Sequence, residues 1–336
     1  MDSKEKEIEA KNKRIEIIKK LEEETGSRVI CYVTGDRPNL VHNVAHDAIR
    51  YIYNHLLEFS KESCEKISLY LYSRGGDTTV PWKMVNMIRE FCKEFYVLVP
   101  YKAHSAATLI ALGADKILMG KMGELSPIDP SVANPFNPDN PLNPHLKLPI
   151  SVEDVTAYIS LLKEKVGLKD PINIIETFNK LPEKIHPLAL GNVNRSHSQI
   201  RSLASKLLKL HSTEEKKIEK IVDYLTEKLY THMHFINRKE AKELDLSIEF
   251  ASGKMETIMW DLYLHYEDIL QLLIPFEPDK ELSKEGEKDR EYYGVVIESK
   301  NLSNLFGGKL VLRSFQGRIS VQPGWLGNYI GNPRGY

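Results

Sequence analysis

The feature that most constrains this chain is a repeated alternation of short apolar runs with longer segments of helical periodicity. The runs at residues 29–33, 67–72, 96–100 and 116–119 are typical of buried strands. Helical segments at residues 44–59, 82–95 and 105–112 separate them. Strands joined by helices of this length form a parallel sheet with right-handed crossover connections. This part of the chain therefore predicts an α/β core.

The rest of the chain has a different character. Seven of its seventeen prolines fall between Pro127 and Pro149, which predicts a long, stiff and irregular loop. Helices are expected at residues 152–166, 172–179, 198–211 and 213–229, and a few strands at 295–321. Residues 4–24 also have helical spacing, and we interpret them as a peripheral helix or an oligomer contact.

These patterns predict a chain of three parts. Residues 1–27 form an N-terminal helix, and residues 28–276 form the main domain of repeated strand–helix units with added helices. Residues 277–336 form a charged linker, which covers 277–290, followed by a small C-terminal β-rich appendage.

The composition argues against several classes of protein. Lys and Arg (46) nearly balance Asp and Glu (47), so no overall field attracts nucleic acid or anionic lipid. The three cysteines form no C-x-x-C pair, which argues against a disulfide framework and a zinc site. No apolar stretch reaches the roughly 18 residues that cross a bilayer, and residues 1–25 alternate Lys and Glu where a signal peptide is apolar. We expect a cytoplasmic protein with no metal, no nucleic-acid partner and no stable membrane insertion.

Ser105 is the first candidate for chemistry, because it follows the third apolar run and opens a helix of small side chains. The Ala106 amide and the helix dipole would offer positive potential to an oxyanion there, although serine at a helix start is most often only a cap. Gly75 and Gly76 end the neighbouring strand, where a glycine backbone can approach a substrate closely. An ordinary tight turn would also explain two glycines.

Five motifs, in this order along the chain, resemble those of the Clp-fold serine peptidases. They are Leu69-Tyr70-Leu71-Tyr72-Ser73-Arg74-Gly75-Gly76-Asp77, Lys102-Ala103-His104-Ser105-Ala106-Ala107, Gly113-Ala114-Asp115-Lys116-Ile117, Gly123-Glu124-Leu125-Ser126-Pro127-Ile128-Asp129-Pro130 and Phe235-Ile236-Asn237-Arg238-Lys239-Glu240-Ala241-Lys242-Glu243-Leu244. The last two are similar to the branch called the serine dehydrogenase proteinase (SDH) family, which is related to signal peptide peptidase A and the Clp protease peptidase subunit. The resemblance spans about residues 28–250 and implies a Clp/crotonase-like α/β core that assembles into homo-oligomers.

The resemblance also implies roles for particular residues. Ser105 matches the nucleophile of a serine peptidase that acts on peptides or unfolded segments, and the amides of Gly76 and Ala106 match its oxyanion hole. Gly75 and Pro127 are expected to contact the substrate. No cofactor is implied, and an ATPase partner is left open.

The general base is the open part of this prediction. Clp-type peptidases carry a histidine where this chain reads residues 126–130, so a Ser-His-Asp triad of that pattern is absent. Relatives of signal peptide peptidase A use a downstream lysine, which Lys147 matches in position. Burial would have to lower its pKa, and Leu146, Leu148, Pro149 and Ile150 are candidates for the apolar wall.

Other groups compete with Lys147 for this role. His234, paired in sequence with His232, needs no pKa shift to act near neutral pH, although such pairs are often packed or at the surface. The two histidines do not indicate a metal site, because the sequence has no third ligand at a spacing typical of such sites. Lys121 and Lys163 are further rivals.

Two other function classes remain open. A chain that kept the fold and lost the base would be a catalytically inactive, homo-oligomeric scaffold. A crotonase-like enzyme would stabilise a thioester enolate in the same hole, but its acyl-CoA pocket needs a basic cluster that we do not find in the sequence.

Overall fold

The chain forms two compact units in a computed structural model. The structure describes residues 3–61, 64–128, 131–132, 135–141, 143–148, 150–228, 234–277, 280, 289–313 and 318–329. One unit comprises Met1–Leu125 and Phe235–Tyr336, and the other comprises Ser126–His234. The second unit is therefore an insertion between two segments of the first. Most of the stretch 277–290, which we interpreted as a charged linker, lies outside the described residues.

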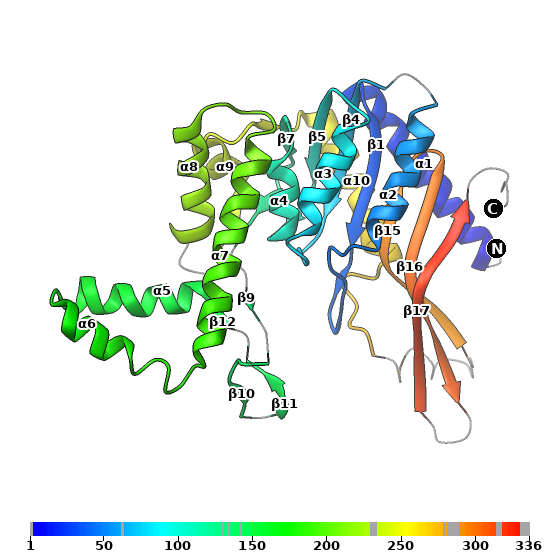
Figure 1. Cartoon of the computed structure of the whole chain (residues 1–336). Helices are drawn as coiled ribbons and strands as arrows, with labels where there is room; N and C mark the ends of the chain where they lie inside the picture. Colours follow the sequence, from blue (N-terminus) through cyan, green and yellow to red (C-terminus); the bar gives the residue numbers. More distant parts are fainter. Residues whose placement is uncertain are drawn as a thin grey trace. The chain divides into compact units, whose positions relative to one another are not determined.

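An eight-stranded mixed sheet is the centre of the first unit (Figure 1). Its parallel part consists of β14 (Ile248–Phe250), β7 (Lys116–Met119), β5 (Glu94–Val99), β4 (Lys66–Tyr72) and β1 (Arg28–Thr34), in that order. Three antiparallel strands continue the order from β1, namely β15 (Asp289–Glu298), β16 (Leu302–Arg313) and β17 (Arg318–Tyr329). The α/β core predicted from the alternating pattern is confirmed. The C-terminal strands, expected as an appendage, continue the main sheet, because β15 pairs directly with β1.

Helices cover both faces of this sheet, as the apolar runs require, because a parallel strand is buried on both sides. On one face lie α2 (Ala48–Phe59), α3 (Val80–Arg89) and α4 (Ala106–Leu112). On the other face α1 (Ser3–Thr25) packs along α10 (Gly253–Ile269). The short helix α9 (Arg238–Glu243) leads from the second unit back toward β14.

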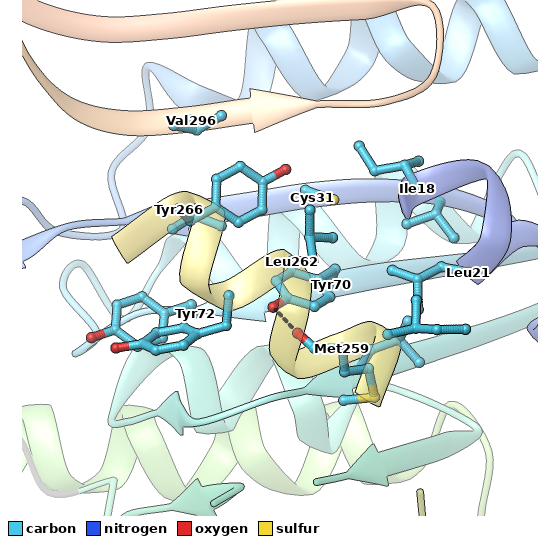
Figure 2. Close-up of a cluster of buried hydrophobic side chains, with 14 of the residues drawn as sticks. Ile18, Leu21, Cys31, Tyr70, Tyr72, Met259, Leu262, Tyr266 and Val296 are labelled. Atoms are coloured by element: carbon cyan, nitrogen blue, oxygen red, sulfur yellow. Dashed lines mark hydrogen bonds between the residues drawn. The ribbon is translucent and has the colours of Figure 1, made fainter. Parts of the chain in front are cut away.

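The N-terminal helix is part of the core, which corrects the expectation of a peripheral helix. Figure 2 shows Ile18 and Leu21 of α1 packed with Tyr70 and Leu262, and both side chains are fully buried. The Tyr70 hydroxyl donates a hydrogen bond to the Met259 carbonyl oxygen at 2.8 Å. Burial of two such aliphatic side chains stabilises the fold by about 1.5–3 kcal/mol each. The helix therefore cannot detach without opening the core.

A buried ion pair also ties α1 to β15. Arg14 Nε and Nη2 lie 2.8 and 3.0 Å from the two carboxylate oxygens of Glu298, and both side chains are almost fully buried. The hydroxyls of Tyr266 and Ser303 donate to the same carboxylate at 3.0 and 2.9 Å. A buried carboxylate is tolerated when its oxygens are satisfied in this way.

A small sheet of three short strands lies beside the main one. Its order is β13 (Ile236–Asn237), β8 (Glu124–Leu125) and β6 (Lys102–Ala103). The β2 (Asp36–Arg37) and β3 (Leu40–Val41) strands form a separate ladder. Because β6 ends two residues before Ser105, the three-stranded sheet leads directly into the candidate site.

The second unit is mainly helical. It contains α5 (Val152–Ser160) with a π-helical extension (Leu161–Lys165), α6 (Pro171–Phe178), α7 (Pro187–Leu208) and α8 (Glu215–Asp223) with a π-helical turn (Tyr224–Lys228). The proline-rich segment forms two small ladders, β9 (Ser131–Val132) with β12 (Ile150–Ser151), and β10 (Asp139–Asn140) with β11 (Asn143–Lys147). In the described residues, no helix combines the length and the apolar character needed to cross a membrane.

Several helix boundaries differ from the prediction, and two of these differences have a clear physical reason. The third helix ends at Arg89 rather than at residue 95, because Glu94 and Phe95 already pair in the sheet with β4. The long helix α7 begins at Pro187 rather than at residue 198. There His186 Nδ1 accepts a hydrogen bond from the Leu188 amide, and proline at the first helical position loses no hydrogen bond.

Candidate active site

Ser105 stands between β6 and α4 with a strained backbone. Its φ is 49° and its ψ is −114°, a region that residues with a side chain rarely adopt. In α4, which is described throughout, the Ser105 side chain makes no capping hydrogen bond. Strained residues persist where their surroundings hold them, and they gather at functional sites. The conformation therefore does not fit a serine that serves only as a helix cap.

Gly75 packs against the turn that carries Ser105. A methyl carbon (Cβ) placed on Gly75 would lie 2.7 Å from both Ser105 Cβ and the His104 carbonyl oxygen, and 3.1 Å from the Ala106 nitrogen. The φ of Gly75 is 100°, which a side chain also disfavours. The glycine turn after β4 and the serine turn before α4 are thus in contact, and only glycine fits between them.

Gly76 is fixed by its neighbour Val44. A Cβ on Gly76 would lie 2.6 Å from the Val44 nitrogen, and its φ is 148°. The Val44 amide donates to the Gly75 carbonyl oxygen at 2.7 Å, and the Asp77 amide donates to the Val44 carbonyl oxygen at 2.9 Å. Within the described residues, the amides of Gly76 and Ala106 donate no hydrogen bond to the backbone of the surrounding turns and loops.

Ser73 holds the glycine turn in place, and the sequence analysis missed it. Its hydroxyl accepts hydrogen bonds from the Thr34 hydroxyl at 2.7 Å and from the Gly75 amide at 3.0 Å. Its amide donates to the Lys102 carbonyl oxygen at 2.9 Å, and its carbonyl oxygen accepts from the His104 amide at 3.0 Å. Buried Ser73 therefore joins the ends of β1, β4 and β6. No local pattern around a single serine indicates this role.

Lys147 lies at the end of β11 in the second unit. Its Nζ is 2.6 Å from Asp139 Oδ1, and its side chain is 37% exposed. Leu146 and Leu148 are exposed as well, so they do not form the apolar wall that we expected around this amine, and Pro149 lies outside the described residues. Asp139 therefore already engages the amine that a general base would need free for the nucleophile.

Two other predicted residues also belong to the second unit. Pro127 is buried, and its carbonyl oxygen accepts a hydrogen bond from the Ser126 hydroxyl at 2.9 Å. His234 is partly buried and is the last residue of this unit, while His232 lies outside the described residues. The structure thus brings Ser105 and Ala106 together with the two glycines in the first unit, and describes the other three predicted residues in the second.

His46, which was not predicted from the sequence, lies beside Asp77 and therefore near Gly76 in the first unit. Its Nε2 is 3.0 Å from the Thr79 hydroxyl and 3.6 Å from Asp77 Oδ2, and its side chain is half exposed. Partial burial opposes ionisation of Asp77, but hydrogen bonds from Thr79 outweigh it and hold the pKa of Asp77 below its usual range. The arrangement is a histidine beside a carboxylate. No sequence pattern indicates it, because the bridge between Val44 and Gly76 that joins these segments forms only in the fold.

Other possible sites are less suited to chemistry. A cavity of about 680 Å³ lies where β1, β4 and β5 begin, the opposite end of these strands from Gly75. Some of its charged side chains pair with one another, as in Arg28 with Glu22 and Lys66 with Glu94. In the described part of the chain, no group of three or more His, Cys, Asp or Glu residues is arranged to hold a metal ion.

Part of the chain is similar to a known protein family. Residues 1–167, which include Ser105 and Lys147 but not His234, match the protein family described as ClpP-like SDH-type serine proteinase. No curated protein matches the chain. One similar solved structure is a mutant of 1510-N, a membrane-bound stomatin-specific protease, with 16% identity and a TM-score of 0.35. The match covers 60% of this chain and 72% of that one.

Proposed function

Because the N-terminal half of this chain belongs to the ClpP-like SDH-type serine proteinases, we propose that it is a serine peptidase whose nucleophile is Ser105. Its substrates are peptides or unfolded polypeptide segments. The observation that carries the proposal is the backbone of Ser105, a residue with a side chain held at a φ of 49° against Gly75. A serine that only capped α4 would direct its hydroxyl to the helix amides and would need no such strain.

In the proposed reaction, Ser105 Oγ attacks the carbonyl carbon of the scissile bond while a general base takes its proton. The carbonyl oxygen becomes an oxyanion that accepts hydrogen bonds from the amides of Gly76 and Ala106. Protonation of the leaving amine breaks the peptide bond, and water then hydrolyses the ester on Ser105. Gly75 and Pro127 contact the substrate chain in this scheme.

The proposed base is Lys147 or His234, and the structure adds His46 as a third candidate. Lys147 would first have to leave Asp139, because its amine must reach the nucleophile in order to accept a proton. His46 already has a carboxylate beside it in Asp77, which would stabilise the imidazolium formed during the reaction. Since each candidate is a separate side chain, single substitutions distinguish them.

Labelling with a fluorophosphonate probe tests the proposal, because the probe reacts with activated serines. We expect the probe to label the wild type but not Ser105→Ala. One of the variants Lys147→Ala, His234→Ala and His46→Ala should lose labelling as well. Ser198→Ala, at an exposed serine of α7, is the matched control and should label normally. Labelling that persists in Ser105→Ala would contradict the assignment. A folded wild type that does not label would favour the inactive scaffold.

We further propose that the protein is cytoplasmic and that residues 28–276, its peptidase domain, assemble as a homo-oligomer. The support is the likeness to Clp-fold peptidases, whose assemblies enclose their active sites. Light scattering on the purified chain measures the molar mass. A mass of 38.5 kDa for active protein would contradict the oligomer.

A further inference from the structure

His104 directly precedes Ser105, and its ring is held on two sides. The residue is 8% exposed, and its Nε2 lies 3.0 Å from Glu124 Oε1. A carboxylate oxygen accepts hydrogen bonds, so we assign Nε2 as the donor of this contact. The ring also stacks on Phe235, with centroids 5.4 Å apart and an interplanar angle of 19°.

The backbone of His104 is engaged just as fully. Its amide donates to the Ser73 carbonyl oxygen at 3.0 Å, and its carbonyl oxygen accepts from the Ala107 amide at 2.8 Å. The same carbonyl oxygen is one of the two atoms that exclude a side chain at Gly75. His104 therefore contacts the glycine turn and the first turn of α4, the two pieces that meet at Ser105.

The two groups that hold the ring belong to the three-stranded sheet. Glu124 lies on β8, where it pairs with Lys102 of β6 and with Asn237 of β13. Phe235 immediately precedes β13. The ring of His104 is thus attached to chain segments that come well after the serine in the sequence. Such long-range attachment is what a strained backbone needs in order to persist.

We propose that His104 is a positioning residue of the peptidase site: the hydrogen bond to Glu124 and the stack on Phe235 hold the Ser105 turn in its reactive conformation. The inference rests on the proposed function of Ser105. A residue that served packing alone would gain nothing from a partly buried carboxylate as its partner, since an aromatic ring would stack on Phe235 equally well. The hydrogen bond is therefore the part of the arrangement that the test must isolate.

Three variants separate the hydrogen bond from the stack. His104→Phe keeps an aromatic ring and loses the donor, His104→Gln keeps a donor and loses the ring, and Glu124→Ala removes the acceptor. Each is tested as the full chain for fluorophosphonate labelling rate, for kcat and KM on a peptide substrate, and for thermal unfolding. Glu249→Ala is the matched control. Glu249 lies on the edge strand β14, and its exposed carboxylate pairs with Lys116 of β7.

We expect His104→Phe and Glu124→Ala to label about 10- to 100-fold more slowly and to lose kcat by a similar factor, with KM nearly unchanged. The double variant should be no slower than either single variant, because both remove one interaction. His104→Gln should recover most of the rate, and Glu249→Ala should match the wild type.

The outcomes distinguish the inference from the function on which it rests. If the wild type labels through Ser105 and His104→Phe labels equally fast, the positioning role is wrong and the peptidase stands. A folded His104→Gln as slow as His104→Phe would also overturn the role of the hydrogen bond. If the probe labels neither the wild type nor any variant, the proposed function itself fails.

Discussion

Gly75 is the single residue at which the candidate site tolerates least change. We expect Gly75→Ala to abolish labelling of Ser105 and to lower the melting temperature, because its Cβ would lie 2.7 Å from atoms of His104 and Ser105. Gly191→Ala is the matched control, since nothing lies within 4 Å of that position in α7. Alanine there should stabilise the protein by about 0.5–1 kcal/mol. Equal labelling and stability of the two variants would contradict the packing described for Gly75.

His55 gives a second prediction at this scale, one about pH. Burial lowers the pKa of His55 to about 4, and its ring nitrogens lie 2.8 Å from the Ser299 hydroxyl and 3.2 Å from Asn304 Oδ1. The unfolded chain titrates near 6.5 and therefore binds more protons between these two values. The free energy of unfolding should be unaffected above about pH 6.5 and should fall by up to about 3 kcal/mol as pH drops to about 4.

Urea unfolding measured at intervals between pH 8 and pH 4 checks this contribution. His55→Gln should flatten the pH dependence, because its amide does not titrate in this range, whereas the exposed His145→Gln should leave it unchanged. If His55→Gln and the wild type lost stability in parallel, the acid sensitivity would belong to other groups.

Among the contacts between elements, the ion pair between α1 and β15 is the one whose loss should lower the free energy of unfolding most. Glu298→Gln would leave the charge of Arg14 buried beside a neutral amide, and we expect the free energy of unfolding to fall by about 3–5 kcal/mol. Arg14→Met combined with Glu298→Gln should cost less than Glu298→Gln alone, because the uncompensated charge is gone.

Lys254→Ala provides the control for that measurement. Lys254 of α10 pairs with Glu24 of α1, so it joins the same helix to the core, but its side chain is 71% exposed. An exposed pair contributes little to stability, and the variant should unfold almost like the wild type. Equal losses in Glu298→Gln and Lys254→Ala would show that burial does not decide the strength of the attachment.

The elements also show what the sequence can and cannot predict. The strand at Lys116–Met119 was predicted to the residue, because a short apolar run between turns is a local signal. The end of α3 was wrong, since apolar residues continue past Arg89 and only pairing with β4 turns Glu94 and Phe95 into a strand. The burial of α1 depends on α10, more than 200 residues later, and no local pattern contains that partner.

The candidate site divides in the same way. Ser105, Gly75 and Gly76 carry local signals, a serine at a helix start and a glycine pair after a strand, and their roles stay predictions that the labelling experiment tests. The contacts of Ser73 and the pair of His104 with Glu124 exist only after distant segments have come together. Lys147 was chosen by its place along the chain, which contains no information about the nearby Asp139.

For the whole molecule, the structure predicts a sharp boundary in C-terminal truncations. Loss of residues 289–336 would expose the backbone edge of β1 and remove Glu298 from Arg14, and we expect this chain to aggregate or to unfold without cooperativity. Loss of residues 314–336 removes β17 and leaves β15 paired with β1, so this chain should remain folded. Soluble yield and thermal unfolding of the two truncated chains test the boundary. Similar behaviour of both would show that β15 is dispensable.

The separation of Arg14 and Glu298 by 284 residues has a consequence for synthesis. At about 5–20 residues per second, a ribosome needs roughly 15–60 seconds to add the second partner after the first. Throughout that time the first unit has an uncompensated arginine and an open strand edge, and it cannot close around its core. In a newly made chain, the first unit would therefore complete the surroundings of Ser105 only after residue 298 has been synthesised.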